Sequence, residues 1–318
     1  MASLKSQILG HQSIITQLEK TYASGRLPHA MIFYGPTGIG KNLTALALAQ
    51  FLVCESDIKP CGDCGSCVRV QKKQSEKLKI ASPDGQFIKV DQIRDILDFL
   101  SLSHQGENRI VIIDQAHLLN PQAANALLKV LEEPSENVYF ILIGPDISQF
   151  MSTIRSRAQS VRFSPLSLQD LQKLRPGLED WIYKASRGQM DQLALFSTEE
   201  GLAYRNYSLQ MVEQFFFNPD FLKDETWKKT LKDREVSAAT VRFWLTFFRD
   251  VLLLQMTAEE KVLNSDQKNL LSKFKKFDSR VLQNFVTDLF QLEKDIKSNA
   301  DTSLLFESLW VKYGQTNQ

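Results

Sequence analysis

A glycine-rich loop and four clustered cysteines are the residues of this 318-residue chain whose types and spacing could do chemistry. The loop, Gly35 to Asn42, follows the apolar run 31–34 and precedes a stretch with helical spacing. In that order of strand, loop and helix, backbone N–H groups, a helix N-terminus and a lysine converge on phosphate oxygens. Because Gly40 and Lys41 are also in register, the motif favours a phosphate-binding loop over an ordinary glycine turn. Its expected ligand residues are Gly35, Thr37, Gly38, Ile39, Gly40, Lys41 and Asn42.

Two positions of this expected site depart from those of an active nucleotide hydrolase. Asn42 stands where a serine or threonine hydroxyl normally binds Mg²⁺, and its side chain is longer. The apolar run 109–113 ends at Asp114, whose carboxylate belongs beside that metal, but the next residue is Gln115. An amide cannot take a proton from the attacking water, and losing a general base typically costs about 10²–10⁴ in rate. We expect a chain that can hold ATP or ADP but places Mg²⁺ and hydrolyses ATP poorly.

The cysteines have the spacing of a metal site. Cys61, Cys64 and Cys67 are separated by two residues each, and Cys54 lies seven residues upstream of the first. Four thiolates can close a tetrahedral zinc site, and no histidine or carboxylate is placed to leave an open position, so the expected role is structural. An iron–sulfur cluster is the alternative with similar spacing, but the upstream fourth cysteine and the absence of a Cys-Pro pair favour zinc. Disulfide bonds and a set of reduced, unmetallated thiols are less favoured.

The composition, with 43% hydrophobic and 24% charged residues, is that of a globular protein long enough for two or three domains. A net charge of +1 disfavours a dedicated nucleic-acid coat protein, so any DNA contact should come from a local patch shared with partners. The first ten residues lack a signal-peptide pattern, and no apolar run reaches the roughly 18 residues of a membrane span. We expect a cytoplasmic protein that contacts no membrane.

The elements that must position these residues fall into three parts. Residues 1–164 alternate between strand and helix patterns, which predicts an α/β domain with a doubly wound parallel sheet. Residues 165–205 predict short helices, and residues 206–318 show helical periodicity with many aromatic side chains, which we expect in a helical core. The predicted strands are 31–34, 77–81, 109–113, 138–143 and 159–163.

Several motifs together carry a resemblance to a known family. They are Gly10-His11-Gln12, Leu27-Pro28-His29-Ala30, the four-cysteine insertion, the block from Ala123 to Pro134, and the block from Thr153 to Ala158. In these motifs the chain resembles the bacterial DNA polymerase III clamp-loader subunits of the AAA+ family, and among them the delta-prime subunits. The resemblance implies an AAA+ nucleotide-binding domain over 1–164 with a zinc module at 54–67, a small helical lid over 165–205, and an all-helical collar over 206–318.

The resemblance also implies a role for Arg157. In such rings the matching arginine reaches the γ-phosphate of ATP held by the neighbouring subunit, and a guanidinium suits this task because it pairs bidentately with phosphate oxygens. A surface or helix-capping arginine is the alternative. The implied partners are the motor and clamp-opening subunits of a heteropentameric ring, the sliding clamp, and primed DNA reached through the assembled complex.

Two further positions depart from the family's pattern. Asp191 stands where active relatives carry an arginine that senses the γ-phosphate, and Gly144-Pro145 replaces a polar sensor. Together with Asn42 and Gln115, these departures imply a subunit without intrinsic ATPase activity that works in a DNA polymerase complex with ATPase partners. The alternative is a catalytically active AAA+ ATPase, of the motor type, with atypical metal ligands. A standalone zinc-bearing DNA-binding module is disfavoured by the near-neutral charge.

Overall fold

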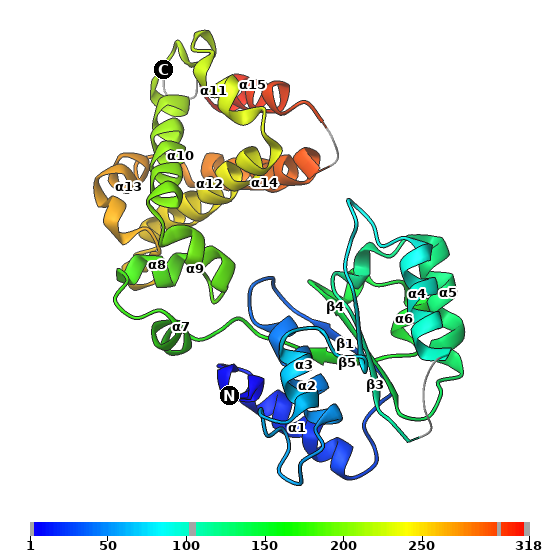
Figure 1. Cartoon of the computed structure of the whole chain (residues 1–318). Helices are drawn as coiled ribbons and strands as arrows, with labels where there is room; N and C mark the ends of the chain where they lie inside the picture. Colours follow the sequence, from blue (N-terminus) through cyan, green and yellow to red (C-terminus); the bar gives the residue numbers. More distant parts are fainter. Residues whose placement is uncertain (1–2, 102–105, 298–299, 315–318) are drawn as a thin grey trace. The chain divides into compact units, whose positions relative to one another are not determined.

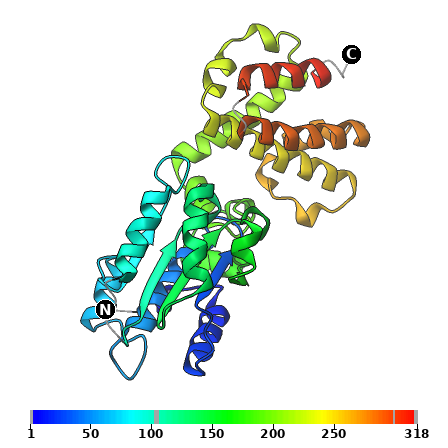
Figure 2. The same ribbon diagram turned by 90° about the vertical axis from the view of Figure 1, so that its right-hand side faces the viewer.

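The computed structural model of the protein describes residues 3–101, 106–297 and 300–314. By its internal contacts the chain divides into two compact units (Figures 1 and 2). This division does not test the expected three domains, which stay a prediction. The first unit comprises Met1–Pro176 and Gly188–Asp191, and the second comprises Gly177–Arg187 and Gln192–Gln318.

Five strands form one parallel sheet in the first unit, in the order β2-β3-β4-β1-β5. Because β4 lies between β3 and β1, the carboxyl ends of these three strands meet at one edge of the sheet. The expected doubly wound parallel sheet is therefore confirmed. The strands are β1 (Ala30–Tyr34), β2 (Leu78–Ala81), β3 (Arg109–Ile113), β4 (Val138–Gly144) and β5 (Gln159–Arg162).

Helices cover both faces of this sheet (Figure 1). The helices between residues 12 and 174 are α1 (Gln12–Ala23), α2 (Lys41–Val53), α3 (Gly65–Gln71), α4 (Val90–Ser101), α5 (Pro121–Glu132), α6 (Ser152–Arg155) and α7 (Leu168–Leu174), of which α7 contributes no residue to the two clusters that cover the sheet. Short 3₁₀ turns are η1 (Leu4–Gln7), η2 (Ala116–Leu118) and η3 (Ile147–Gln149). Met31 and Phe33 pack with α1 and α2, whereas Ile32 packs with α4 and α5 on the other face. All of β3 is buried, which explains its continuous run of β-branched residues.

In the described part of the second unit, every regular element is a helix. Most of the unit's large aromatic side chains form its core, as expected from their periodicity. Phe217 and Phe290 are exceptions, because 45% and 55% of their surfaces stay exposed. The helices are α8 (Asp180–Ala185), α9 (Met190–Phe196, which begins in the first unit), α10 (Glu199–Phe217), α11 (Thr226–Leu231), α12 (Arg234–Gln255), α13 (Lys268–Phe274), α14 (Ser279–Lys297) and α15 (Thr302–Tyr313), with the turns η4 (Phe221–Lys223), η5 (Glu259–Lys261) and η6 (Ser265–Gln267).

The fully buried Phe285 of α14 lies at the centre of this aromatic core. Its ring centroid is 5.0 Å from that of Phe216, 4.8 Å from that of Phe248 and 4.9 Å from that of Tyr313. We expect Phe285→Ala to lower the free energy of unfolding by about 3–5 kcal/mol, because it leaves a cavity. The matched control is Phe290→Ala on the same helix, where 55% of the side chain is exposed and the change should be below about 0.5 kcal/mol. Urea unfolding followed by circular dichroism measures both, and equal shifts would contradict this packing.

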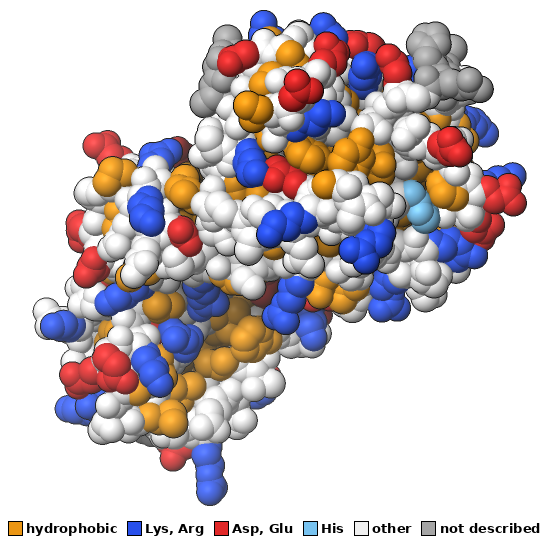
Figure 3. Space-filling view, turned by 90° about the horizontal axis from the view of Figure 1, so that it is seen from below, with side chains coloured by type: hydrophobic (Ala, Val, Ile, Leu, Met, Phe, Trp, Pro, Cys, Tyr) orange, Lys and Arg blue, Asp and Glu red, His pale blue; other side chains and the backbone are white. Residues whose placement is uncertain are grey.

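The molecular surface carries charges of both signs. On the face drawn in Figure 3, basic and acidic side chains are interspersed, in keeping with the net charge of +1. None of the described helices combines the length and apolar character that a membrane span requires.

Candidate functional site

The glycine-rich loop connects β1 to α2 at the carboxyl edge of the sheet. Gly40 has φ +95°, a left-handed conformation that only glycine adopts without strain, and α2 begins at the next residue, Lys41. The first backbone N–H groups of α2 thus open onto the loop, as in an anion-binding helix N-terminus. This is the geometry expected of a phosphate loop.

Most of the predicted nucleotide-binding residues line a single pocket. Its volume of about 410 Å³ falls within the usual range for small-molecule sites, roughly 300–1,000 Å³. The structure brings together every predicted nucleotide-binding residue except Gly35, which is not among the lining residues. The lining residues are Thr37, Gly38, Ile39, Gly40, Lys41, Asn42, Asp114, Gln115, His117, Ile143, Gly144 and Pro145.

The ammonium group of Lys41 is turned back onto the loop. Its Nζ donates hydrogen bonds to the carbonyl oxygens of Gly35, at 2.7 Å, and Pro36, at 2.5 Å. Burial lowers the pKa of Lys41 below its ordinary value, while the carboxylates of Asp114 and Asp191 act in the opposite direction. A phosphate ligand would therefore have to draw Lys41 away from two carbonyl partners.

Asn42 and Asp114 form a side-chain hydrogen bond across the pocket. Asn42 Nδ2 donates to Asp114 Oδ2 at 2.9 Å, and the backbone N–H of Gln115 donates to Asp114 Oδ1 at 3.0 Å. A carboxylate can only accept, so Asn42 must present its NH₂ group and not its oxygen to Asp114. Both oxygens of Asp114 thus have donors, and the residue beside it, Gln115, is an amide that cannot act as a general base.

Residues 188–191 belong to the first unit and contact the phosphate loop. The backbone N–H of Met190 donates to the carbonyl oxygen of Gly38 at 2.7 Å, and Asp191 lies directly against Gly38. Arg187, by contrast, is part of the second unit, where its guanidinium donates to Thr246 Oγ1 at 3.1 Å. The residue that the structure brings to the phosphate loop is the aspartate.

His117, which the sequence pattern did not single out, lines the pocket from η2. Burial lowers the pKa of this histidine, so the imidazole is mainly neutral at pH 7. Its position three residues after Asp114, at the end of a buried strand, was the available signal.

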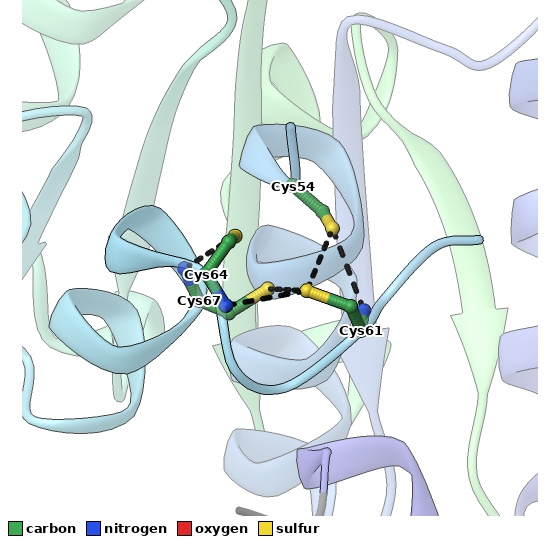
Figure 4. A group of neighbouring side chains, drawn as sticks. All are labelled: Cys54, Cys61, Cys64 and Cys67. Atoms are coloured by element: carbon green, nitrogen blue, oxygen red, sulfur yellow. Dashed lines mark hydrogen bonds between the residues drawn. The ribbon is translucent and has the colours of Figure 1, made fainter. Parts of the chain in front are cut away.

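The four cysteines lie between the end of α2 and the first turn of α3, where Cys67 is located (Figure 4). Their sulfur atoms all lie within 4.8 Å of one another, with 3.6 Å from Cys54 to Cys61 and 3.9 Å from Cys61 to Cys67. Four sulfurs bound tetrahedrally at about 2.3 Å from one Zn²⁺ would be about 3.8 Å apart. The donor set and its spacing therefore fit a tetrahedral metal ion.

Backbone groups of the same segment support the sulfurs. The N–H groups of Cys61, Cys64 and Cys67 donate to the Sγ atoms of Cys54, Cys61 and Cys64 at 3.3–3.4 Å. The N–H of Cys64, followed by that of Asp63, lowers the pKa of Cys61 to about 6, whereas burial raises the pKa of Cys67. These four cysteines can hold a metal ion, and the N–H groups favour the thiolate form that a metal needs.

A buried glutamine, which the sequence analysis also missed, ties this cluster to the helix that follows the phosphate loop. Gln50 of α2 donates through Nε2 to the carbonyl oxygen of Cys67 at 3.1 Å. Its Oε1 accepts the N–H of Leu4 at 2.9 Å. Because α2 carries Lys41 at one end and is followed by Cys54 at the other, one helix positions both groups.

Arg157 follows α6 and lies outside the phosphate pocket of its own chain. Its guanidinium forms an ion pair with Glu132 at the end of α5 and donates to the carbonyl oxygen of Thr153 at 2.9 Å and to Ser156 Oγ at 3.2 Å. The side chain remains 32% exposed. Arg157 is thus held in a defined orientation that a partner can still reach.

Two family models match this chain. The model described as "DNA polymerase III, delta subunit" matches residues 10–167, and that described as "DNA polymerase III, delta subunit, C terminal" matches residues 211–313. The DNA polymerase III subunit delta' of Bacillus subtilis is 27% identical over 93% of this chain and 94% of its own length. This chain belongs to the delta-prime family of DNA polymerase III subunits.

Another delta-prime relative, from Haemophilus influenzae, is 38% identical over 46% of this chain and 46% of its own length. The DNA polymerase III subunit tau of Escherichia coli is 34% identical over 55% of this chain, which spans only 27% of that relative. A gamma subunit-related protein from Thermotoga maritima shares the fold, with a TM-score of 0.53 at 17% identity over 96% of this chain and 99% of its own. With the parallel sheet and the helical second unit, these likenesses confirm the expected AAA+ fold class.

Proposed function

We propose that this delta-prime family member works as a clamp-loader subunit that does not hydrolyse ATP itself and supplies Arg157 to the ATP site of a neighbouring subunit. It would complete a heteropentameric ring with motor and clamp-opening subunits. The ring would load the sliding clamp onto primed DNA, with this chain reaching the DNA through the assembled complex.

The observation that carries the proposal is the hydrogen bond between Asn42 and Asp114. In a working hydrolase these two positions hold Mg²⁺, and the next residue orients the attacking water. Here the first two bond to each other and the third is Gln115, so metal placement and proton abstraction are impaired together. Binding of ATP, ADP or Mg²⁺ is not required for the proposed role.

The surroundings of Arg157 support its action on another chain. Its guanidinium is oriented by Glu132, Thr153 and Ser156, and it is not among the residues that line its own phosphate pocket. Such preorganisation lowers the entropy lost when an arginine engages phosphate oxygens.

The cysteine cluster completes the proposal as a structural zinc site held by Cys54, Cys61, Cys64 and Cys67. Zn²⁺ would neutralise thiolates that the backbone N–H groups already favour, and it would fix the segment between α2 and α3. All four positions are taken by sulfur, so no position is left for a substrate.

The isolated chain tests the first part of the proposal. With ATP and Mg²⁺ and without partners, we expect phosphate release at background level, and Lys41→Ala should leave it unchanged because there is no turnover to lose. Phosphate release is measured with a coupled fluorescent assay. A rate well above background that Lys41→Ala removes would instead favour the alternative, an active motor-type ATPase with atypical metal ligands.

A further inference from the structure

The acidic side chain of Asp191 packs against Gly38 of the phosphate loop, beside the pocket and not among the residues that line it. If Gly38 had a Cβ atom, it would lie 2.2 Å from Asp191 Oδ1 and 2.5 Å from Asp191 Cγ. The carboxylate therefore packs against the backbone of Gly38. Because this glycine has no side chain, its backbone N–H group can approach phosphate oxygens.

The backbone holds this carboxylate in place. Met190 N–H donates to Gly38 O at 2.7 Å, and Thr37 Oγ1 donates to Gln189 Oε1 at 3.5 Å, so two bonds tie residues 189 and 190 to the loop. Gln192 and later residues belong to the second unit, but residues 188–191 are packed within the first. Asp191 is thus placed by its own unit.

The charged side chains around the pocket also disfavour binding of a nucleoside triphosphate. Among the described residues that line it, Lys41 is the only lysine or arginine, and Asp114 contributes one negative charge. Asp191 adds a second carboxylate that acts on Lys41. One cation faced by two anions gives a site with little attraction for the several negative charges of a nucleoside triphosphate.

We propose that Asp191 is a specificity-determining residue that keeps nucleoside triphosphates out of the phosphate loop, by placing its negative charge against Gly38, beside the pocket in which phosphate oxygens would bind. The loop keeps its shape because Lys41 bonds to loop carbonyls and Asn42 bonds to Asp114, so no nucleotide is needed to order it. The inference deepens the proposed function, since it concerns binding where that proposal concerns hydrolysis.

The size of the effect follows from Coulomb's law. Two unit charges about 4 Å apart change a binding constant by roughly fivefold in bulk water and roughly a thousandfold near a protein surface. Asp191 is exposed, so solvent weakens its field. We expect Asp191→Asn to tighten ATP binding by about tenfold or more, with a smaller gain for ADP because ADP carries less charge.

The experiment titrates the full chain with fluorescent N-methylanthraniloyl derivatives of ATP and ADP in the presence of Mg²⁺. Asp191→Asn removes the charge, and Asp191→Arg reverses it and should tighten ATP binding further. The matched control is Asp95→Asn on the exposed face of α4, which makes the same charge change away from the pocket and should leave affinity within twofold. The gain from Asp191→Asn should also shrink as salt is raised from 50 to 500 mM.

Thermal unfolding followed by circular dichroism checks that each variant is folded, which is expected because Asp191 is exposed. The inference is overturned if Asp191→Asn and Asp191→Arg both bind ATP within twofold of the wild type, or if Asp95→Asn gains as much. It is also overturned if the wild type already binds ATP as tightly as the variants. These results leave the hydrolysis test separate, since that test follows phosphate release and not affinity.

Discussion

Replacing Arg157 by alanine is expected to slow ATP hydrolysis at the neighbouring subunit's site by about 10³-fold or more, the usual effect of losing an arginine that acts in trans. The guanidinium offsets charge that develops on the transferred phosphoryl group. The measurement is DNA-stimulated ATP turnover by the reconstituted ring. Single-turnover hydrolysis is measured as well, because it separates the chemical step from product release.

Three further variants sharpen this test. Arg157→Lys keeps the positive charge but loses the planar fork, so it should recover only part of the activity. Arg155→Ala, on the exposed surface of α6 two residues earlier, is the matched control and should behave like the wild type. Glu132→Gln removes the ion-pair partner of Arg157 and should not abolish turnover. Wild-type hydrolysis by an Arg157→Ala ring, shown to be fully assembled by gel filtration, would remove the trans role.

Loss of the metal site is the second large expected effect. Cys67→Ser should reduce the bound zinc from about one ion per chain to none, since Cys67 is fully buried and no other sulfur is at hand to replace it. Without the metal, the segment loses the four bonds that would fix it. We expect the melting temperature of the first unit to fall by about 10 °C, which corresponds to a few kcal/mol.

Metal content is measured by inductively coupled plasma mass spectrometry and stability by circular dichroism. A strong chelator should destabilise the wild type to the level of Cys67→Ser and leave the variant unchanged. Ile58→Ser is the control, because Ile58 lies in the same segment with 81% of its surface exposed and should keep both metal and stability. Iron with visible absorption in the wild type would instead support the iron–sulfur alternative, and a metal-free, equally stable wild type would contradict any structural metal.

Local pattern was sufficient to predict the sheet. The expected strands 31–34, 109–113 and 138–143 agree with β1, β3 and β4 to within one residue at each end. Each is an apolar run that is buried on both faces, so its sequence is dictated by its own surroundings and is recognisable without its neighbours. The same holds for the glycine loop, whose residues must adopt special backbone conformations wherever the chain goes next.

The contents of the phosphate pocket could be predicted only in part. Residue types at Asn42 and Gln115 already indicated impaired hydrolysis, and parallel-strand topology implied that Asp114 would reach the same edge of the sheet. The sequence pattern did not indicate that Lys41 would bond to loop carbonyls, that His117 would lie half-buried in the pocket, or that Gln50 would be buried beside the cysteine cluster. Those contacts depend on how separate helices, strands and loops pack together. The hydrophobic periodicity of a single segment carries no information about that packing.

By itself, the sequence determined the fold class, the phosphate loop and the cysteine cluster, because each is encoded over a short stretch whose spacing follows from strand, helix or metal-ligand geometry. Only the tertiary structure decided the hydrogen bond between Asn42 and Asp114, the contact of Asp191 with Gly38, and the anchoring of Arg157 by Glu132. The physical reason is separation along the chain. Asn42 and Asp114 are 72 residues apart, so only the order of strands in the folded sheet brings their side chains within hydrogen-bonding distance.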